Sequence, residues 1–202
     1  MRIKGTSISS FLAFLEAEYT PPRARAFIAT LDPDLRRRCE GLVLASAFYP
    51  YADLETLAQR ARTHFEGSAD FFVRSGAFNA DFGLSGVYAA LLARPTPFDF
   101  LKAVERAWGQ FSDTGSATVE MVSDGKAKVR IEGLTISPVL CDRQTGYLTR
   151  SLSLAGAKEL KVKKGLCVQK GDKACEWTVS WDAATSPQSR TQTSALRRPA
   201  VI

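Results

Sequence analysis

The chain has 202 residues, of which 45% are hydrophobic and 24% are charged, so it can form one ordinary globular core. It contains no run of eighteen apolar residues, and its net charge of +6 is not accompanied by a zinc-finger, helix-turn-helix or RNA-binding motif. These features predict neither a membrane span nor nucleic-acid binding. Because no signal peptide is recognised and four cysteines are too few for a secreted disulfide framework, we expect a cytoplasmic protein with reduced thiols.

The first part of the chain has the apolar spacing of helices. We expect the first helix to be capped by Thr6 or Ser7, and the second to open at Pro21-Pro22, because proline is tolerated in a first turn. A short basic helix is expected after Asp32-Pro33. Further helices are expected after Tyr49-Pro50, over about residues 68–93, and after Thr96-Pro97.

From residue 114 onward the apolar period changes to two, which is typical of half-buried strands. The Asp124-Gly125 pair between two alternating runs predicts a hairpin. A helix that ends at Gly156 and a second hairpin around Gly171 are expected to follow.

This order of elements predicts an α+β fold in which an N-terminal helical layer packs on an antiparallel sheet with an inserted helix. We expect a single domain over residues 1–183, helical over 1–113 and sheet-rich over 114–183. Residues 184–202 are rich in Ser, Thr, Gln and Arg without an apolar period, and are predicted to be a disordered basic tail.

Three cysteines of the second part can converge in this fold. Cys167 and Cys175 lie symmetrically about Gly171, so in a hairpin they would stand almost directly opposite each other, with β-carbons about 4.5 to 5.5 Å apart. Cys141 precedes the expected helix, whose N-terminus favours a thiolate. The residues alone leave three alternatives open: a metal site, a cluster of buried apolar thiols, and a redox pair or disulfide.

A family resemblance rests on this cysteine region. The ending C-x3-G-D-x2-C-E-W-x-V-x-W, with a cysteine before the helix, resembles the 4-vinyl-reductase domain. That small-molecule-binding module is similar in fold to the haem nitric-oxide-binding domain and to TRAPP vesicle-tethering subunits. Over about residues 3–182 the chain also looks like an uncharacterised myxobacterial paralogous family, with Lys4-Gly5 near the start and Tyr49-Pro50 after an apolar segment.

The resemblance implies a zinc site, because sensor members of the 4-vinyl-reductase group hold zinc with three cysteines and a glutamate. By position, Cys141, Cys167 and Cys175 match the three thiolate ligands. The glutamate falls on Lys164, which is not a zinc ligand and whose ammonium would repel the ion. The remaining candidates for a fourth ligand are Asp142, Glu159, Asp172 and water. A bound zinc would be structural, since no histidine is available in this half to act as a base.

Haem is not the expected cofactor. His64 is the only histidine, it lies near a helix end, and the Tyr-x-Ser-x-Arg motif of haem nitric-oxide-binding proteins is absent. Neither a phosphate-binding loop nor a carboxylate dyad is recognisable, so no enzymatic activity is expected.

The helices carry enough aromatic residues to surround an apolar ligand, with Arg74, Asn79 and Asp81 as polar anchors. We therefore expect a non-enzymatic sensory or regulatory module that binds a small apolar molecule and acts as a homodimer or on a protein partner. The alternative is an interaction or scaffold module that has the same fold and no ligand.

Overall fold

A computed structural model of the protein describes residues 1–134 and 137–183. The chain begins with a short strand, β1 (Arg2–Lys4), that runs directly into helix α1 (Gly5–Tyr19). The other elements before the main sheet are α2 (Pro21–Ile28), α3 (Pro33–Glu40), β2 (Phe48–Pro50), α4 (Tyr51–His64), α5 (Phe71–Leu84), the 3-10 turn η1 (Ala89–Leu91), α6 (Pro97–Arg106) and the 3-10 turn η2 (Trp108–Gln110).

The predicted helix starts at prolines are confirmed, because α2, α3 and α6 each open with a proline in the first turn. The predicted capping of α1 by Thr6 or Ser7 is wrong. The helix already begins at Gly5, and Lys4 is its N-cap residue without a side-chain cap. The pair of strands β1 and β2, antiparallel with Arg2 opposite Pro50, was not predicted, since three residues are too few to show a period.

The main sheet has four antiparallel strands in the order β3-β4-β6-β5. These are β3 (Ser116–Ser123), β4 (Lys126–Glu132), β5 (Lys161–Lys164) and β6 (Ala174–Ser180). The predicted hairpin at Asp124-Gly125 is confirmed as the β3–β4 turn, and Gly125 has a φ of 71°, which favours glycine. Helix α7 (Pro138–Leu154) precedes β5, and Gly156 follows its end with a φ of 90°, as predicted.

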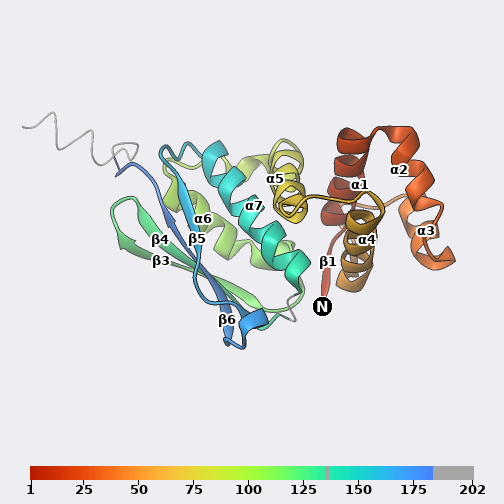
Figure 1. Ribbon diagram of the computed structural model, residues 1–202. Helices are drawn as coiled ribbons and strands as arrows, with labels where there is room; N and C mark the ends of the chain where they lie inside the picture. The colour runs from red at the N-terminus through yellow and green to blue at the C-terminus, as the bar shows by residue number, and fades with distance from the viewer. Residues whose placement is uncertain (135–136, 184–202) are drawn as a thin grey trace, which may run out of the picture.

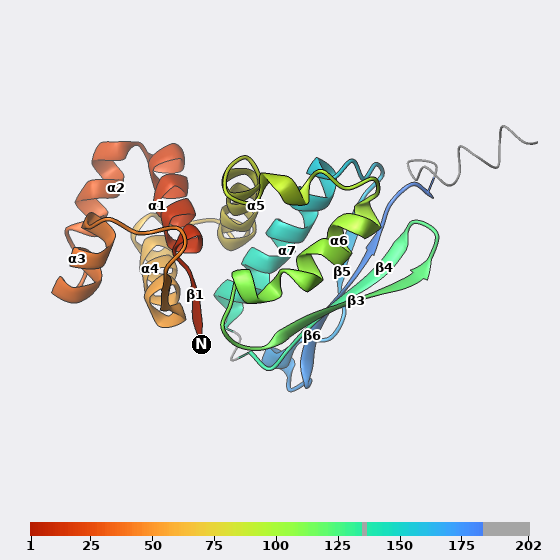
Figure 2. The ribbon, with the colours of Figure 1, turned by 180° about the vertical axis from the view of Figure 1, so that it is seen from behind.

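The elements form two halves that meet along helix α5. Helices α6 and α7 lie along one face of the four-stranded sheet, and α5 lies between α7 and α1 (Figure 1). The N-terminus and β1 lie between the group of helices α1 to α4 and the half that bears the sheet (Figure 2). The α+β fold, helices packed on an antiparallel sheet, is therefore confirmed.

Two hydrophobic clusters correspond to the two halves. The first is built around Phe11, Phe27 and Leu57. The second is built around Trp177 and the alternating buried residues of β4 and β6. Met1 and Leu140 pack against both clusters, so the two cores touch at these residues.

The prediction of one domain over residues 1–183 stays a prediction, and the predicted tail, 184–202, lies outside the described residues. Within residues 1–134 and 137–183, no helix is both long and apolar enough to cross a membrane.

Candidate functional site

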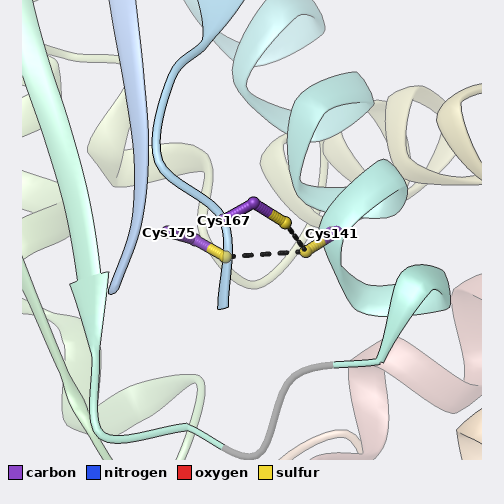
Figure 3. Close-up of side chains that lie close together, drawn as sticks. All are labelled: Cys141, Cys167 and Cys175. Carbon is purple, nitrogen blue, oxygen red and sulfur yellow. Dashed lines mark hydrogen bonds between the residues drawn. The ribbon is translucent and has the colours of Figure 1, made fainter. Parts of the chain in front are cut away.

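The three predicted cysteines come together between helix α7 and the sheet. The Cys141 sulfur lies 3.9 Å from that of Cys167 and 3.6 Å from that of Cys175, and all three sulfurs are within 4.8 Å of one another. Cys141 approaches from the helix, whereas the other two come from the β5–β6 side (Figure 3). All three side chains are buried, so the cluster is closed to bulk solvent.

Two details of this convergence differ from the sequence prediction. Helix α7 begins at Pro138, so Cys141 lies in its first turn and not before the helix. The β5–β6 pairing ends at Lys164 opposite Trp177, so Cys167 lies beyond the strand and is not directly opposed to Cys175.

Cys167 is positioned by a local turn and not by strand pairing. The Cys167 backbone N–H donates to the Asp172 carboxylate at 2.7 Å, while its carbonyl accepts from the Lys170 N–H at 2.8 Å. Gly171 closes this turn in the left-handed region, with a φ of 90°. The Lys-Gly-Asp sequence therefore builds the turn, and the turn holds the thiol.

Lys164 sets the electrostatics of the cluster, because its ammonium hydrogen-bonds the sulfurs of Cys141 and Cys167. Burial raises the pKa of Cys141 to about 12, and the neighbouring Cys175 adds to that rise. Burial is the largest effect on Cys167 and raises its pKa, but the hydrogen bond and charge of Lys164, together with hydrogen bonds from the Gln169 backbone and Cys141, hold this pKa below its usual value. Cys167 therefore ionises more readily than Cys141, as the partner of a lysine cation.

The sulfur geometry fits a metal, and the surrounding charge opposes one. A tetrahedral zinc ion with Zn–S bonds of about 2.3 Å holds its sulfurs roughly 3.8 Å apart, close to the two distances observed. Among the described residues, no histidine or carboxylate joins the three thiols. Asp172, one of the predicted fourth ligands, is already held by the Cys167 backbone. The three cysteines can therefore hold a metal ion, but Lys164 brings a positive charge to two of the sulfurs where a metal site would need an anionic ligand.

A second feature is a cavity at the junction of the two halves, with a volume of about 100 Å³. Its wall includes Met1 and Leu140, which also join the two hydrophobic clusters. The other lining residues are Ile3, Ser7, Leu54, Asn79, Val104, Trp108, Phe111, Ser112, Leu134, Arg143, Gln144 and Tyr147. The wall is mostly apolar with a few polar groups, which is the usual make-up of a small-molecule site.

Tyr147 is the polar residue of this wall that most clearly lacks a partner. Its hydroxyl is buried and makes no hydrogen bond with any residue in the described part of the chain. Burial raises the pKa of the Tyr147 hydroxyl, so it stays protonated and can donate. Since buried hydroxyls normally have a partner, a ligand atom or a water is expected to supply one.

Of the three predicted polar anchors, only Asn79 lines the cavity, where its amide oxygen accepts a hydrogen bond from Ser10. Arg74 pairs with Glu18 and Asp70, and Asp81 pairs with Arg150, all away from the cavity. Sequence reasoning missed Arg143 and Tyr147, because their positions in α7 carry no motif, and only the packing of α5 against α7 places them at the cavity.

No family model matches the chain, and no curated protein matches it in sequence. Solved structures do resemble its fold. An H-NOX protein from S. oneidensis in the Fe(II)NO ligation state has a TM-score of 0.72 at 11% identity, and the match covers 89% of this chain and 99% of that one. The Fe(II) unliganded H-NOX protein from K. algicida has a TM-score of 0.68 at 12% identity, with 89% and 97% covered.

An oxygen-binding H-NOX domain related to soluble guanylate cyclases is also similar, with a TM-score of 0.70 at 10% identity and 89% and 95% of the two chains covered. At such identities the likeness shows the fold alone, and it confirms the expected haem-nitric-oxide-binding-like fold. The comparisons do not support the resemblance to a myxobacterial paralogous family.

Two of these neighbours are named as Fe(II) proteins, and a further similar structure, with a TM-score of 0.69 at 10% identity, is described by its haem redox potential, so these structures give no support to the expectation that haem is absent. The residues of this chain provide a separate test. The single histidine, His64, packs against Phe27 and Phe65 and does not line the cavity. The cavity volume of about 100 Å³ is also below the ~300–1,000 Å³ of pockets for drug-sized ligands. The residues present therefore do not fit a histidine-ligated haem.

Proposed function

We propose that this protein is a haem-free sensory or regulatory module that binds a small, mostly apolar molecule in the cavity between its two halves. The observation that carries the proposal is the position of the cavity, whose wall includes the two residues, Met1 and Leu140, that join the hydrophobic clusters. A ligand in this cavity contacts both halves at once, so its binding can change how they pack. We infer a binding role and not a catalytic one, because the described residues that line the cavity include no histidine, cysteine or carboxylate to form a nucleophile and base pair.

The size of the cavity limits the ligand. An engineered cavity of about 150 Å³ with apolar walls binds benzene, so ~100 Å³ accommodates a molecule of about four to six heavy atoms. We use 1-butanol as a neutral probe, since it has a short apolar chain and one hydroxyl that can pair with Tyr147.

Thermal denaturation tests this proposal. A ligand at ten times its dissociation constant adds about 1.4 kcal/mol to stability, or roughly 3 to 6 °C in Tm for a chain of this size. Leu140→Trp should fill the cavity and abolish the rise caused by 1-butanol. The matched control is Leu154→Phe, which adds an aromatic ring to the exposed end of the same helix and should leave the rise unchanged. If 1-butanol shifts the Leu140→Trp variant as much as the parent protein, the cavity is not the binding site.

The haem-free part of the proposal has its own measurement. Protein expressed with a haem precursor and purified without added metal should show no Soret band. A stoichiometric Soret band would refute this part and leave the cavity to be reconsidered as a haem pocket.

We also propose that the cysteine cluster braces α7 against β6, with a zinc ion as the brace when metal is present. The support is the convergence of three buried sulfurs at distances that suit tetrahedral zinc. Elemental analysis combined with thiol titration tests this. Protein with far less than one zinc per chain and freely titratable thiols would leave the cysteines as a packed apolar cluster.

A specific surface feature supports the alternative of an interaction module. A groove of about 530 Å³ beside α1 contains the side chains of Leu42, which is 85% exposed, and Phe82, which is 39% exposed. Glu16, Arg25 and Glu40 line the same groove, so both signs of charge flank the apolar residues. A surface with both charge signs is suited to a second copy of the chain, and we propose a homodimer through this groove.

Sedimentation of the full chain tests the dimer. Leu42→Asp should shift the protein to monomer, whereas Val87→Asp, a change at another exposed apolar residue outside the groove, should not. A parent protein that is monomeric at every concentration would rule out this interface.

A further inference from the structure

Arg143 is a buried cation for which the described chain offers no counter-ion. Its side chain is 4% exposed, one guanidinium nitrogen donates to the Ser75 hydroxyl at 3.0 Å, and its carbon lies 5.3 Å from the Phe11 ring centre. No carboxylate of the described residues forms an ion pair with it. The residues outside the described part contain neither Asp nor Glu, so they offer no acidic side chain either.

The charge of Arg143 persists at neutral pH. Burial lowers its pKa to about 10, which still leaves the guanidinium protonated. The titratable group whose charge acts on the pKa of Arg143 is Tyr51, but burial raises the pKa of Tyr51 itself to about 12, so Tyr51 is neutral and does not balance the charge. A hydroxyl and an aromatic face compensate only part of the desolvation of a guanidinium, and arginines this deeply buried are normally paired with an anion.

The guanidinium also lies close to the proposed ligand site. Arg143 itself lines the cavity. Its two contacts are one helical turn from cavity residues, since Ser75 precedes Asn79 on α5 and Phe11 follows Ser7 on α1. Arg143 is therefore a residue of the cavity wall whose positive charge no carboxylate of the described residues balances.

We infer that the cavity takes a small carboxylate, whose negative charge is balanced by Arg143 and whose short chain lies against the apolar wall. This inference rests on the proposed function and makes it narrower, because it names the chemical class of the ligand. Tyr147, one turn further along α7 with its unpartnered hydroxyl, is a second donor for the same carboxylate. The volume of about 100 Å³ restricts the ligand to a chain of about four carbons.

The test compares butyrate with butyramide, which has the same number of heavy atoms and no charge. Both are titrated into the full-chain protein at pH 7 with matched ionic strength, and Tm and the dissociation constant are measured. We expect butyrate to bind at least about tenfold more tightly than butyramide, because hydrogen bonds to a charged partner are roughly twice as strong as neutral ones.

Two variants on the same helix separate a specific role of Arg143 from general attraction of anions. Arg143→Met keeps an unbranched apolar stem and removes the charge, so it should abolish the preference for butyrate. Arg150→Met removes an arginine that is exposed and pairs with Asp81, and it should keep the preference. Equal loss in both variants would mean that net charge alone attracts the acid, which would overturn the inference.

A measurement on the parent protein covers the case in which Arg143→Met does not fold. Simple carboxylic acids titrate at about pH 4 to 5. The advantage of butyrate over butyramide should therefore be constant from pH 7 to 6 and shrink as the pH falls below 5. No advantage at pH 7 overturns the inference.

The outcomes also distinguish this inference from the proposed function. If 1-butanol and butyramide stabilise the parent protein and butyrate is no better, the cavity binds small molecules and the carboxylate inference fails. If none of the three probes stabilises it, both fail. If butyrate alone stabilises it, in a manner that depends on Arg143 and is blocked by Leu140→Trp, both stand.

Discussion

Replacement of Gly146 by alanine is expected to force helices α5 and α7 apart. Gly146 lies in the middle of α7, and a β-carbon at this position would stand 1.8 Å from the Val73 carbonyl oxygen on α5. Non-bonded carbon contacts have an optimal separation of about 3.5 Å, so the two backbones must separate by roughly 1.7 Å. The three nearest atoms, the Val73 carbonyl oxygen and carbon and the Ala77 nitrogen, are all backbone atoms of α5, so no side chain can rotate away to make room.

The magnitude follows from two opposing effects. Alanine is the better helix former, which favours the variant by about 1 kcal/mol. Overpacking a tight contact costs typically ~1–3 kcal/mol, and the upper end applies here because whole helices must move. The net loss is therefore about 2 kcal/mol or more, which corresponds to a Tm lower by roughly 4 to 8 °C for a protein of this size.

Urea unfolding of Gly146→Ala and Gly109→Ala measures this effect. A β-carbon on Gly109 meets nothing within 4 Å, so that variant should stay within about 0.5 kcal/mol of the parent. Gly76→Ala should resemble Gly146→Ala, because its β-carbon would stand 1.9 Å from the Arg143 carbonyl oxygen. The double variant should lose less than the sum, since one separation of the helices relieves both contacts. If Gly146→Ala unfolds at the same urea concentration as Gly109→Ala, close packing of the α5 and α7 backbones does not limit the residue at position 146.

Three further predictions concern the cysteine cluster, the core and the N-terminal strand. Lys164→Glu removes the ammonium beside the thiols and supplies a carboxylate. After dialysis this variant should retain about one zinc per chain, and the parent protein should retain less. Equal zinc contents by elemental analysis would contradict this prediction. Trp177→Phe removes the hydrogen bond from the buried indole to the Thr145 hydroxyl at 2.8 Å, and should cost about 1 to 3 kcal/mol in urea unfolding, whereas an unchanged midpoint would show that the bond is dispensable. Hydrogen bonds from the Arg2 backbone and side chain hold the pKa of Asp113 well below its ordinary value, so its stabilising effect is present above about pH 4 and is lost as the pH falls further. Asp113→Asn should therefore have a lower Tm than the parent at pH 7, by a difference that shrinks as the pH falls below about 4, and a constant difference from pH 7 to 2 would exclude the ionised carboxylate as the cause.

The cysteine cluster illustrates how one residue changes the chemistry of a preserved geometry. The three sulfurs meet at distances that suit zinc, and the lysine that hydrogen-bonds two of them also stabilises a thiolate when no metal is present. Zinc and the Lys164 ammonium therefore compete for the same negative charge. This competition is the physical reason for expecting weaker zinc binding in the parent protein than in Lys164→Glu.

Much of the fold could be predicted from local sequence. Prolines marked the starts of α2, α3 and α6, and the Asp124-Gly125 pair marked the turn between β3 and β4. The strand alternation that placed Trp177 inside was also correct. These features act within a few residues of the chain, which is why a sequence alone contains them.

Local sequence could not predict the short β1–β2 pair or the exact position of Cys167. β1 and β2 pair residues that are almost fifty positions apart, so no local period records them. The turn at Gly171 and Asp172, which follows the end of the strand, positions Cys167. The prediction from hairpin symmetry had placed this residue directly opposite Cys175.

From the sequence by itself, the hairpin spacing predicted that Cys141, Cys167 and Cys175 can converge, while the place of Lys164 beside them came from the family resemblance. Only the tertiary structure decided where a ligand can bind. The cavity is made by β1, α1, α4, α5, α6 and α7 together, and the isolation of Arg143 from every described carboxylate becomes visible only when these elements are packed. A charge is balanced or unbalanced by groups near it in space, and those groups come from distant parts of the chain.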